Sequence, residues 1–132
     1  MKKYIFFTLF TCLIVSSCKS KSTEKKDAEY AKIEFREITY DYGEISYASD
    51  GKCEFEFVNS SNIPLLINTV KTSCGCTNPE WPQKPIQPGE KGHVGVSYNT
   101  TNTGPFKKTV TVYSNAENSP VTLFIRGNVL TP

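Results

Sequence analysis

Apolar and polar residues alternate with a period of two through most of the chain after residue 30, and no stretch there keeps the 3.6-residue period of an amphipathic helix. This alternation is typical of β-strands that bury one face and expose the other. The predicted strands are residues 33–42, 52–58, 63–70, 93–98, 107–113 and 121–129, with a further short strand near 45–47. About seven short strands in about 100 residues predict an all-β fold, an immunoglobulin-like antiparallel β-sandwich.

The alternation also predicts which side chains form the core. The expected core residues are Phe55, Phe57, Leu65, Ile67, Val94, Val96, Tyr98, Val110, Val112, Val121, Leu123 and Ile125. Cys53 has the same parity as Phe55 and Phe57, so we expect it to pack as a small, inert apolar group. His93, the only histidine, has the opposite parity to Val94, so we expect its imidazole to face solvent.

The N-terminal residues have the pattern of a bacterial secretion signal. Two lysines precede an apolar run over residues 4–15, which is shorter than the roughly 20 residues of a membrane-spanning helix. The run ends in Val15-Ser16-Ser17-Cys18, which resembles a bacterial lipobox. We therefore expect residues 1–17 to be a lipoprotein signal peptide and Cys18 to carry the acyl chains that anchor the mature protein to a membrane.

The charge of the chain argues against a nucleic-acid partner. Lys2 and Lys3 account for the formal net charge of +2, so removal of the signal leaves 13 basic and 13 acidic side chains. Residues 18–31 are rich in Lys, Ser, Thr and Glu and contain little that could be buried. We interpret them as the lipidated cysteine and a flexible tether, followed by one folded domain over residues 32–132.

Three cysteines remain in the predicted domain, Cys53, Cys74 and Cys76, so at most one disulfide can form within it. The run Ser73-Cys74-Gly75-Cys76-Thr77 permits three interpretations, and we favour a structural one. One cysteine of the run bonds Cys53, or both pack in a tight corner whose flanking Ser and Thr supply hydrogen bonds. No cation lies within the run to lower the pKa of a thiol.

The other two interpretations give the cysteine pair a chemical role. In one, Cys74 and Cys76 form a disulfide across Gly75, and so small a ring is strained and readily reduced, which suits redox use. In the other, the two thiolates bind a soft metal such as copper(I). Tetrahedral zinc would need two more ligands, and only His93 and Cys53 are available, on different predicted faces. The sequence leaves the metal unknown, and nothing in it predicts a cofactor.

A proline-rich segment follows the cysteine run, with a proline at every third position: Pro79, Pro82, Pro85 and Pro88. This is the period of a polyproline II helix, whose stiffness would hold Cys74, Cys76 and Trp81 in a defined place. Trp81 is the only tryptophan. We expect it to cap one end of the core, with a stacking platform for a sugar or a peptide as the alternative.

Common catalytic motifs are absent from the sequence. It contains no nucleophile-elbow glycine pattern, no phosphate-binding glycine loop and no metalloprotease helix motif, and its single histidine leaves little for a catalytic triad. The sequence therefore predicts that the protein is not an enzyme.

Several collinear motifs resemble the signature of the domain of unknown function 1573 family. They are Asp41-Tyr42-Gly43, Phe55-Glu56-Phe57-Val58-Asn59, Pro64-Leu65-Leu66-Ile67, Ser73-Cys74-Gly75-Cys76-Thr77, Pro85-Ile86-Gln87-Pro88-Gly89, Gly104-Pro105-Phe106 and Gly127-Asn128-Val129. The resemblance runs from about residue 35 to residue 129. It implies an immunoglobulin-like domain of the hydin and major sperm protein type in an exported bacterial protein, often a lipoprotein, and it implies no activity. The family usually has a glycine soon after Asn59, where this chain has Ser60-Ser61-Asn62.

These observations lead to a hypothesis about function and location. We expect a non-catalytic immunoglobulin-like module of the cell envelope, lipid-anchored through Cys18 to the outer membrane on its periplasmic or surface leaflet. It would bind or scaffold through its loops or strand edges, with an envelope protein or a glycan as the partner. The alternative hypothesis is a thiol redox or copper(I)-handling protein that acts through Cys74-Gly75-Cys76. The partner, the leaflet, the redox state of the cysteines and the oligomeric state do not follow from the sequence.

Overall fold

The alternating segments form eight β-strands in the computed structural model, which describes residues 30–132. The predicted signal peptide, Cys18 and almost all of the predicted tether lie outside these residues. The strands are β1 (Ile33–Phe35), β2 (Thr39–Ile45), β3 (Lys52–Asn59), β4 (Ile67–Thr72), β5 (Thr77–Glu80), β6 (Lys91–Tyr98), β7 (Gly104–Ser114) and β8 (Val121–Val129).

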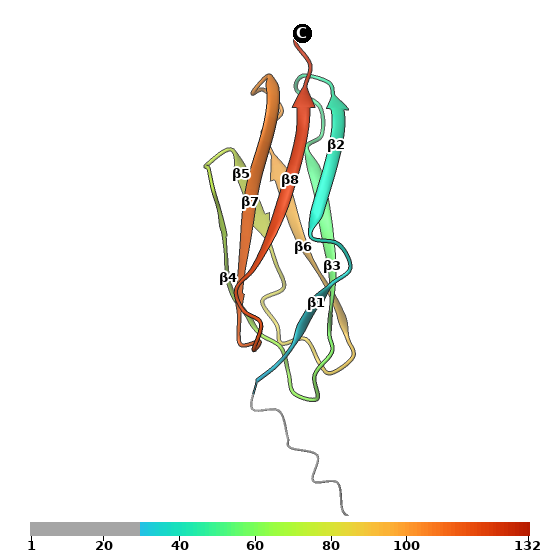
Figure 1. Ribbon diagram of the computed structural model, residues 1–132, viewed down its shortest axis with the longest axis vertical. Helices are drawn as coiled ribbons and strands as arrows, with labels where there is room; N and C mark the ends of the chain where they lie inside the picture. The colour runs from blue at the N-terminus through green and yellow to red at the C-terminus, as the bar shows by residue number, and fades with distance from the viewer. Residues whose placement is uncertain (1–29) are drawn as a thin grey trace, which may run out of the picture.

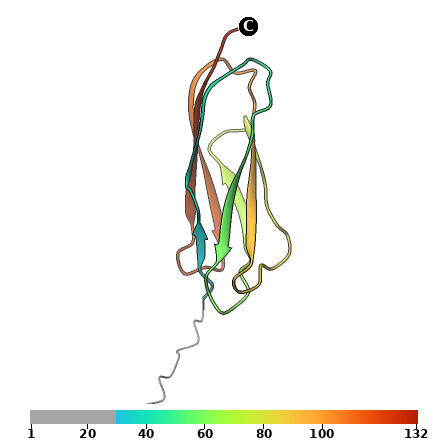
Figure 2. The same cartoon turned by 90° about the vertical axis from the view of Figure 1, so that its right-hand side faces the viewer.

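The strands form two four-stranded sheets that pack face to face, as Figures 1 and 2 show. One sheet has the order β1-β3-β6-β5 and the other the order β2-β8-β7-β4. The predicted immunoglobulin-like sandwich is confirmed. One difference is that β2 pairs with β8 in parallel, while the other strand pairs are antiparallel.

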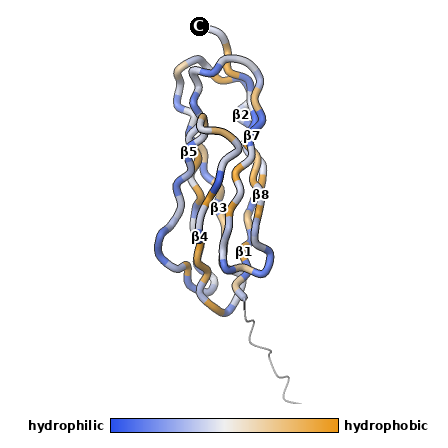
Figure 3. Tube along the Cα trace, turned by 90° about the vertical axis from the view of Figure 1, so that its left-hand side faces the viewer, coloured by the Kyte–Doolittle hydropathy of each residue, from blue (hydrophilic) through white to orange (hydrophobic). Residues whose placement is uncertain are grey.

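The core lies between the sheets and is built from the predicted faces. Hydrophobic and hydrophilic residues alternate along the strands (Figure 3), and each apolar residue of the expected core is buried except Val121, which is partly buried against it. Ala31, which the sequence places at the end of the tether, is also fully buried and bridges Ala116. Within residues 30–132, no helix is long and apolar enough to cross a membrane.

The predicted single strand over residues 33–42 is wrong, because the chain changes sheets in the middle of it. β1 pairs with β3, and β2 pairs with β8 in the other sheet. The crossing lies between Phe35 and Thr39, where the backbone N–H of Phe124 in β8 donates to the carbonyl oxygen of Ile38 (2.8 Å). No glycine or proline marks this crossing in the sequence, so the strand pattern continues through it.

The proline-rich segment begins with a strand that the sequence does not predict. Pro79 lies within β5, where it is opposite Val96 at the edge of the sheet. Proline is tolerated at an edge because the missing N–H faces away from the neighbouring strand. Further along, Ile86 and Leu65 exchange two backbone hydrogen bonds, so the segment is tied to the chain before β4 rather than standing alone as a polyproline II helix.

Candidate functional site

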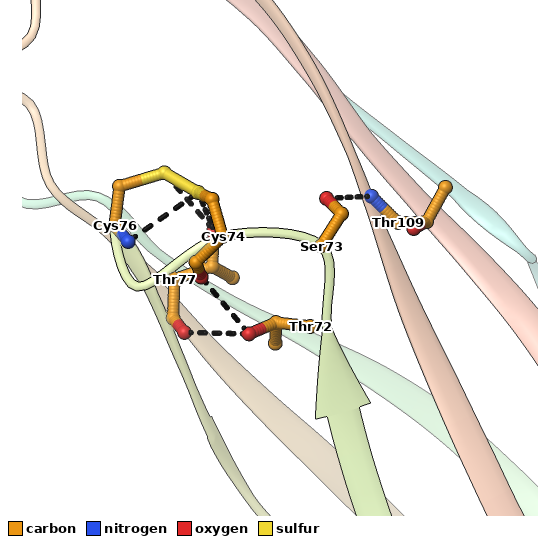
Figure 4. Close-up of a disulfide and its surroundings, with 6 residues drawn as sticks. All are labelled: Thr72, Ser73, Cys74, Cys76, Thr77 and Thr109. Atoms are coloured by element: carbon orange, nitrogen blue, oxygen red, sulfur yellow. Dashed lines mark hydrogen bonds between the residues drawn. A yellow bond between two sulfur atoms is a disulfide. The ribbon is translucent and has the colours of Figure 1, made fainter.

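Cys74 and Cys76 form a disulfide with each other at the corner between β4 and β5 (Figure 4). Their Cα atoms are 5.3 Å apart, within the range that a disulfide spans. Cys53 is buried and free, as expected for an inert core thiol. The favoured interpretation, in which one cysteine bonds Cys53 or both simply pack, is therefore wrong. In the disulfide state neither sulfur is a thiolate, so the pair does not offer copper(I) its usual ligands.

Hydrogen bonds hold the corner in place independently of the disulfide. The Ser73 N–H donates to the carbonyl oxygen of Thr109 (3.1 Å), and the Thr109 N–H donates to the Ser73 hydroxyl (3.1 Å). The Thr72 hydroxyl lies 3.0 Å from the carbonyl oxygen of Cys74 and 3.2 Å from that of Thr77, and donates to them. On the other side, the Asn99 N–H donates to the carbonyl oxygen of Cys76 (2.8 Å). Ser73 thus bonds the corner as the sequence predicts, whereas the threonine hydroxyl that bonds its backbone is that of Thr72 and not that of Thr77.

The two sulfurs share a small set of polar neighbours. The Cys76 N–H donates to Sγ of Cys74 at 3.3 Å. The hydroxyl oxygen of Thr77 lies 3.8 Å from each sulfur, and the Thr77 side chain is only 2% exposed. The disulfide itself points away from Ser73 and Thr109 (Figure 4), and both cysteines are half-buried. A buried hydroxyl therefore faces a disulfide that solvent can reach.

Lys71 is the nearest cation to the pair in sequence, and it does not turn toward the sulfurs. Its Nζ lies 5.5 Å from the centre of the Tyr113 ring, on the neighbouring strand β7. The Lys71 ammonium group thus lies over the Tyr113 ring of the neighbouring strand. Lys71 therefore does not stabilise a thiolate at this corner, whereas the hydrogen-bond donors beside the sulfurs could.

Cys53 lies next to Tyr42, whose hydroxyl donates to the carbonyl oxygen of Gly51 (2.6 Å). Burial raises the pKa of the Tyr42 phenol, and the neighbouring thiol raises it further. Burial likewise raises the pKa of the Cys53 thiol, with Tyr42 lowering it in part. Both groups are therefore neutral at ordinary pH and belong to the packing of the domain.

Trp81 packs against the core as a cap, and its indole N–H is buried with no hydrogen-bond partner in the described residues. The same side chain lines a shallow hollow on the outer face of the first sheet, together with Glu54, Glu80 and His93. His93 is exposed as predicted, with its Nε2 3.6 Å from a carboxylate oxygen of Glu56. Among residues 30–132, no group of three or more His, Cys, Asp or Glu side chains is placed to hold a metal ion.

The sequence gives no sign of a second feature, an open edge on β3. The Arg36 N–H donates to the carbonyl oxygen of Glu56 (3.0 Å), so the backbone N–H and C=O groups of even-numbered residues of β3 point toward β1. The Tyr98 N–H donates to the carbonyl oxygen of Gly51 (2.9 Å), so those of odd-numbered residues point toward β6. The backbone N–H and C=O of Glu54 therefore point toward the β1 side. Continued pairing would place Ile38 there, but Ile38 has crossed to the other sheet. Glu54 is left without a neighbouring strand on this side.

A hollow of about 210 Å³ lies beside this edge. Its lining comes from the sheet crossing and from β3: Arg36, Glu37, Thr39, Tyr40, Glu54, Phe55 and Glu56. Three of the lining residues are glutamates and one is an arginine. Tyr40 is 38% exposed and stacks edge-on against Tyr42, with ring centres 4.8 Å apart. The edge thus combines free backbone groups, an aromatic surface and a net negative charge.

The opposite edge of the same sheet offers no free N–H. The backbone N–H and C=O groups of Asn78 and Glu80 point toward β6, so those of Thr77 and Pro79 point to the outer side of β5. The Thr77 N–H donates to the carbonyl oxygen of Cys74 (3.4 Å), and Pro79 has no N–H. A second strand could not pair with β5 in the ordinary way, so the two edges of the sheet differ in what they can bind.

A family model described as "Protein of unknown function (DUF1573)" matches residues 33–129, in agreement with the resemblance read from the motifs. No curated protein matches the chain. A protein of unknown function from Porphyromonas gingivalis W83 has a similar structure, with a TM-score of 0.68 and 13% sequence identity. The similarity covers 82% of this chain and 51% of that one, so this chain spans about half the length of the P. gingivalis protein.

Two further structures have the same fold. The ASH / PapD-like domain 7 of human CEP192 has a TM-score of 0.65 at 7% identity, over 78% of this chain and 88% of that one. The secreted serine protease VesC from Vibrio cholerae has a TM-score of 0.57 at 14% identity, over 80% of this chain and 25% of that one. At these identities the similarities establish the immunoglobulin-like fold and carry no activity with them.

Proposed function

The chain belongs to the DUF1573 family of proteins of unknown function, and we propose that it is a lipid-anchored binding module of the bacterial cell envelope. Its ligand is an extended segment of a partner protein, which adds as a strand to the open edge of β3. The observation that carries the proposal is the backbone of Glu54, whose N–H and C=O point away from β6 and have no strand beside them. Strand addition at such an edge is a common way to bind an extended peptide.

The hollow beside Glu54 indicates what kind of segment fits. Tyr40 supplies an exposed aromatic surface for one side chain of the ligand, and Glu37 and Glu54 favour a Lys or Arg near it. The third glutamate of the hollow, Glu56, already pairs with Lys91 (3.1 Å). Because side chains of a strand alternate in direction, we expect apolar residues at every second position of the ligand. Pro79 disfavours pairing at β5, the opposite edge of this sheet.

A pair of variants at Glu54 separates strand addition from contacts of the side chain. Glu54→Pro removes the free N–H without touching the bonds to β6, and Glu54→Ala removes the carboxylate but keeps the N–H. A photoreactive phenylalanine analogue in place of Tyr40, in living cells, should cross-link to a partner protein in the parent and in Glu54→Ala. In Glu54→Pro we expect the adduct to be lost while the melting temperature stays close to that of Glu54→Ala.

Sequencing of the cross-linked peptide completes this test. The proposal requires a segment with alternating apolar residues and at least one Lys or Arg. Adducts that form equally in Glu54→Pro, adducts with folded surfaces that lack such a segment, or no protein adduct at all would each refute strand addition at β3. The last of these results is the one that a glycan partner would give.

The anchor is tested separately at Cys18. The two N-terminal lysines, the short apolar run and the Val15-Ser16-Ser17-Cys18 sequence support lipidation at this residue. Cys18→Ser should abolish acylation, so the substituted protein should lack acyl chains by intact-mass measurement and should leave the detergent phase on phase separation. Cys53→Ser is the matched control, since its thiol is buried in the core and its loss should leave acylation intact. Acyl chains on the Cys18→Ser protein would refute the anchor.

A further inference from the structure

The disulfide at the β4–β5 corner adds little to the stability of the fold. A disulfide stabilises mainly by closing a loop in the unfolded chain, and its effect grows with the length of that loop. Cys74 and Cys76 are two residues apart in the sequence, so the loop between them is minimal. The corner is already held by the Ser73–Thr109 and Thr72 hydrogen bonds and by the bond from Asn99 to Cys76. A purely structural role therefore leaves the pair unexplained.

We propose that the Cys74–Cys76 disulfide is a thiol–disulfide exchange site that oxidises a dithiol of a partner protein, with Cys74 as the sulfur released in the first step. The proposal rests on the geometry of the corner and is independent of ligand binding at the β3 edge. Thr77 is the positioning residue of the site, because its hydroxyl faces both sulfurs.

An attacking thiolate can reach the disulfide. Both cysteines are half-buried and Gly75 between them is exposed. Apart from Cys74 and Cys76, no residue has an atom within 4 Å of a Cβ atom built at Gly75, so the rest of the domain leaves the space beside Gly75 open. The corner lies toward the end of the sandwich opposite the point where the chain enters at residue 30 (Figure 1). The corner thus lies away from the point where the described residues begin.

The surroundings of the two sulfurs differ, and the difference selects the leaving group. Sγ of Cys74 accepts the Cys76 N–H at 3.3 Å and also has the Thr77 hydroxyl at 3.8 Å, whereas Sγ of Cys76 has the hydroxyl alone. Thr77 is 2% exposed, and within residues 30–132 its hydroxyl has the two sulfurs as its only hydrogen-bond partners. A thiolate formed at Cys74 would thus gain two donors that are already in place, one of them shielded from water.

The exchange is balanced in two steps. A thiolate of the partner attacks Sγ of Cys76, a new S–S bond forms between them, and the Cys74–Cys76 bond breaks with its electron pair on Sγ of Cys74. The second thiolate of the partner then attacks the partner's own sulfur in the mixed disulfide, and Cys76 leaves as a thiolate. The partner dithiol becomes a disulfide, two electrons pass to the pair, and the protons lost by the partner's thiols are taken up as Cys74 and Cys76 become thiols.

The test uses the full chain in detergent, with Cys12, Cys18 and Cys53 replaced so that Cys74 and Cys76 are its only thiols. The disulfide is equilibrated with mixtures of reduced and oxidised glutathione at pH 8, and the reduced fraction is measured by alkylation and mass spectrometry. The same samples are followed by circular dichroism. We expect reduction to be reversible and complete while the β-sandwich stays folded.

Thr77→Val removes the hydroxyl and keeps the shape of the side chain, and Thr100→Val is its matched control. Thr100 is 4% exposed and its hydroxyl donates to the carbonyl oxygen of Ser49, so its loss removes a buried hydroxyl without contact with sulfur. Thr77→Val should lower both the reduced fraction at equilibrium and the rate of reduction by glutathione, each by about tenfold, because the thiolate loses a donor. Thr100→Val should change either quantity by less than about twofold.

Two results would overturn the proposal. One is a disulfide that is reduced only when denaturant unfolds the domain, which would make the bond a closed structural link. The other is a Thr77→Val protein whose equilibrium and rate match those of Thr100→Val, which would remove the hydroxyl from any role in exchange. Neither result bears on the Glu54 variants, so failure here and failure of ligand binding at β3 are distinguishable.

Discussion

The two edges of the sheet β1-β3-β6-β5 end in opposite ways. At the β5 edge the chain closes on itself, through the Cys74–Cys76 disulfide, the Thr77 N–H and the missing N–H of Pro79. At the β3 edge the covering strand leaves at Arg36, and the backbone of Glu54 stays open. The β5 edge is closed by residues that are close in sequence. The β3 edge is open because β2 pairs with β8, which lies far along the chain, in the other sheet.

This difference shows how one domain can present two unlike surfaces. A closed edge resists pairing with other chains, which protects a β-sheet protein from aggregation. An open edge only a few residues long keeps the ability to bind but does not extend far enough to template a long strand. The predictions below test first what the two edges share and then what separates them.

Val96→Asp should have the largest effect, because Val96 connects both edges. It is 2% exposed and pairs with Cys53 on one side and with Pro79 on the other. A carboxylate there would be buried without a partner, at a cost of several kcal/mol against a total stability of about 5 to 15 kcal/mol. Urea unfolding followed by circular dichroism measures the loss. Ser97→Asp, on the outer face next to it, should unfold at nearly the parent's urea concentration, and equal midpoints for the two variants would contradict the assigned faces.

Gly51→Ala should have the next largest effect, at the start of β3, where Gly51 bonds to Tyr98 of β6. A Cβ atom on Gly51 would collide with the carbonyl oxygen of Tyr98 and lie 3.0 Å from the Thr100 side chain. The backbone cannot easily move away, since the Tyr98 N–H donates to the carbonyl oxygen of Gly51. We expect a loss of about 1 to 3 kcal/mol in the free energy of unfolding. A chemical denaturation curve that overlies that of the parent would show that this strand start is looser than described.

Tyr42→Phe should have a smaller effect that depends on pH. The variant loses the hydrogen bond to Gly51, about 1 kcal/mol near neutral pH. Burial raises the pKa of Tyr42 in the folded protein above its ordinary value, so above about pH 10 the unfolded chain loses a proton that the folded one keeps. The contribution of Tyr42 is therefore complete below pH 10 and decreases above it. Unfolding at pH 7 and pH 11 should show a smaller alkaline loss in Tyr42→Phe than in the parent, while Tyr47→Phe, at an exposed position, should show the parent's loss in full.

The sequence predicts the core and most strands well because one face of each strand is buried, so apolar residues must recur at every second position. β8 is found at its observed limits, Val121–Val129, and Phe55, Val94, Val110 and Leu123 are buried as expected. These features depend on local alternation alone. The immunoglobulin-like fold follows from the number and spacing of such strands.

The features that the sequence misses depend on pairing between distant segments. The crossing at Ile38 is set by its hydrogen bond from Phe124 in β8, and the strand β5 exists because β6 accepts a proline-containing partner at its edge. The choice among three cysteines is an exception, because the two that bond are only two residues apart in the sequence. Cys74 and Cys76 are brought together by their own corner, whereas Cys53 lies in the core of β3.

Gly75→Ala should have the smallest effect, which makes it the sharpest comparison with Gly51→Ala. From the sequence, Gly75 is the glycine that a tight corner between two cysteines requires. Apart from its neighbours Cys74 and Cys76, no residue has an atom within 4 Å of an added Cβ, and Gly75 is not among the glycines with positive φ. The alanine variant should therefore keep its free energy of unfolding within about 0.5 kcal/mol of the parent. Its reduction by glutathione should become slower, since the methyl group occupies the open side of the disulfide. If Gly75→Ala lowers the free energy of unfolding more than Gly51→Ala does, glycine is required at the disulfide corner rather than at the start of β3, and the prediction is wrong.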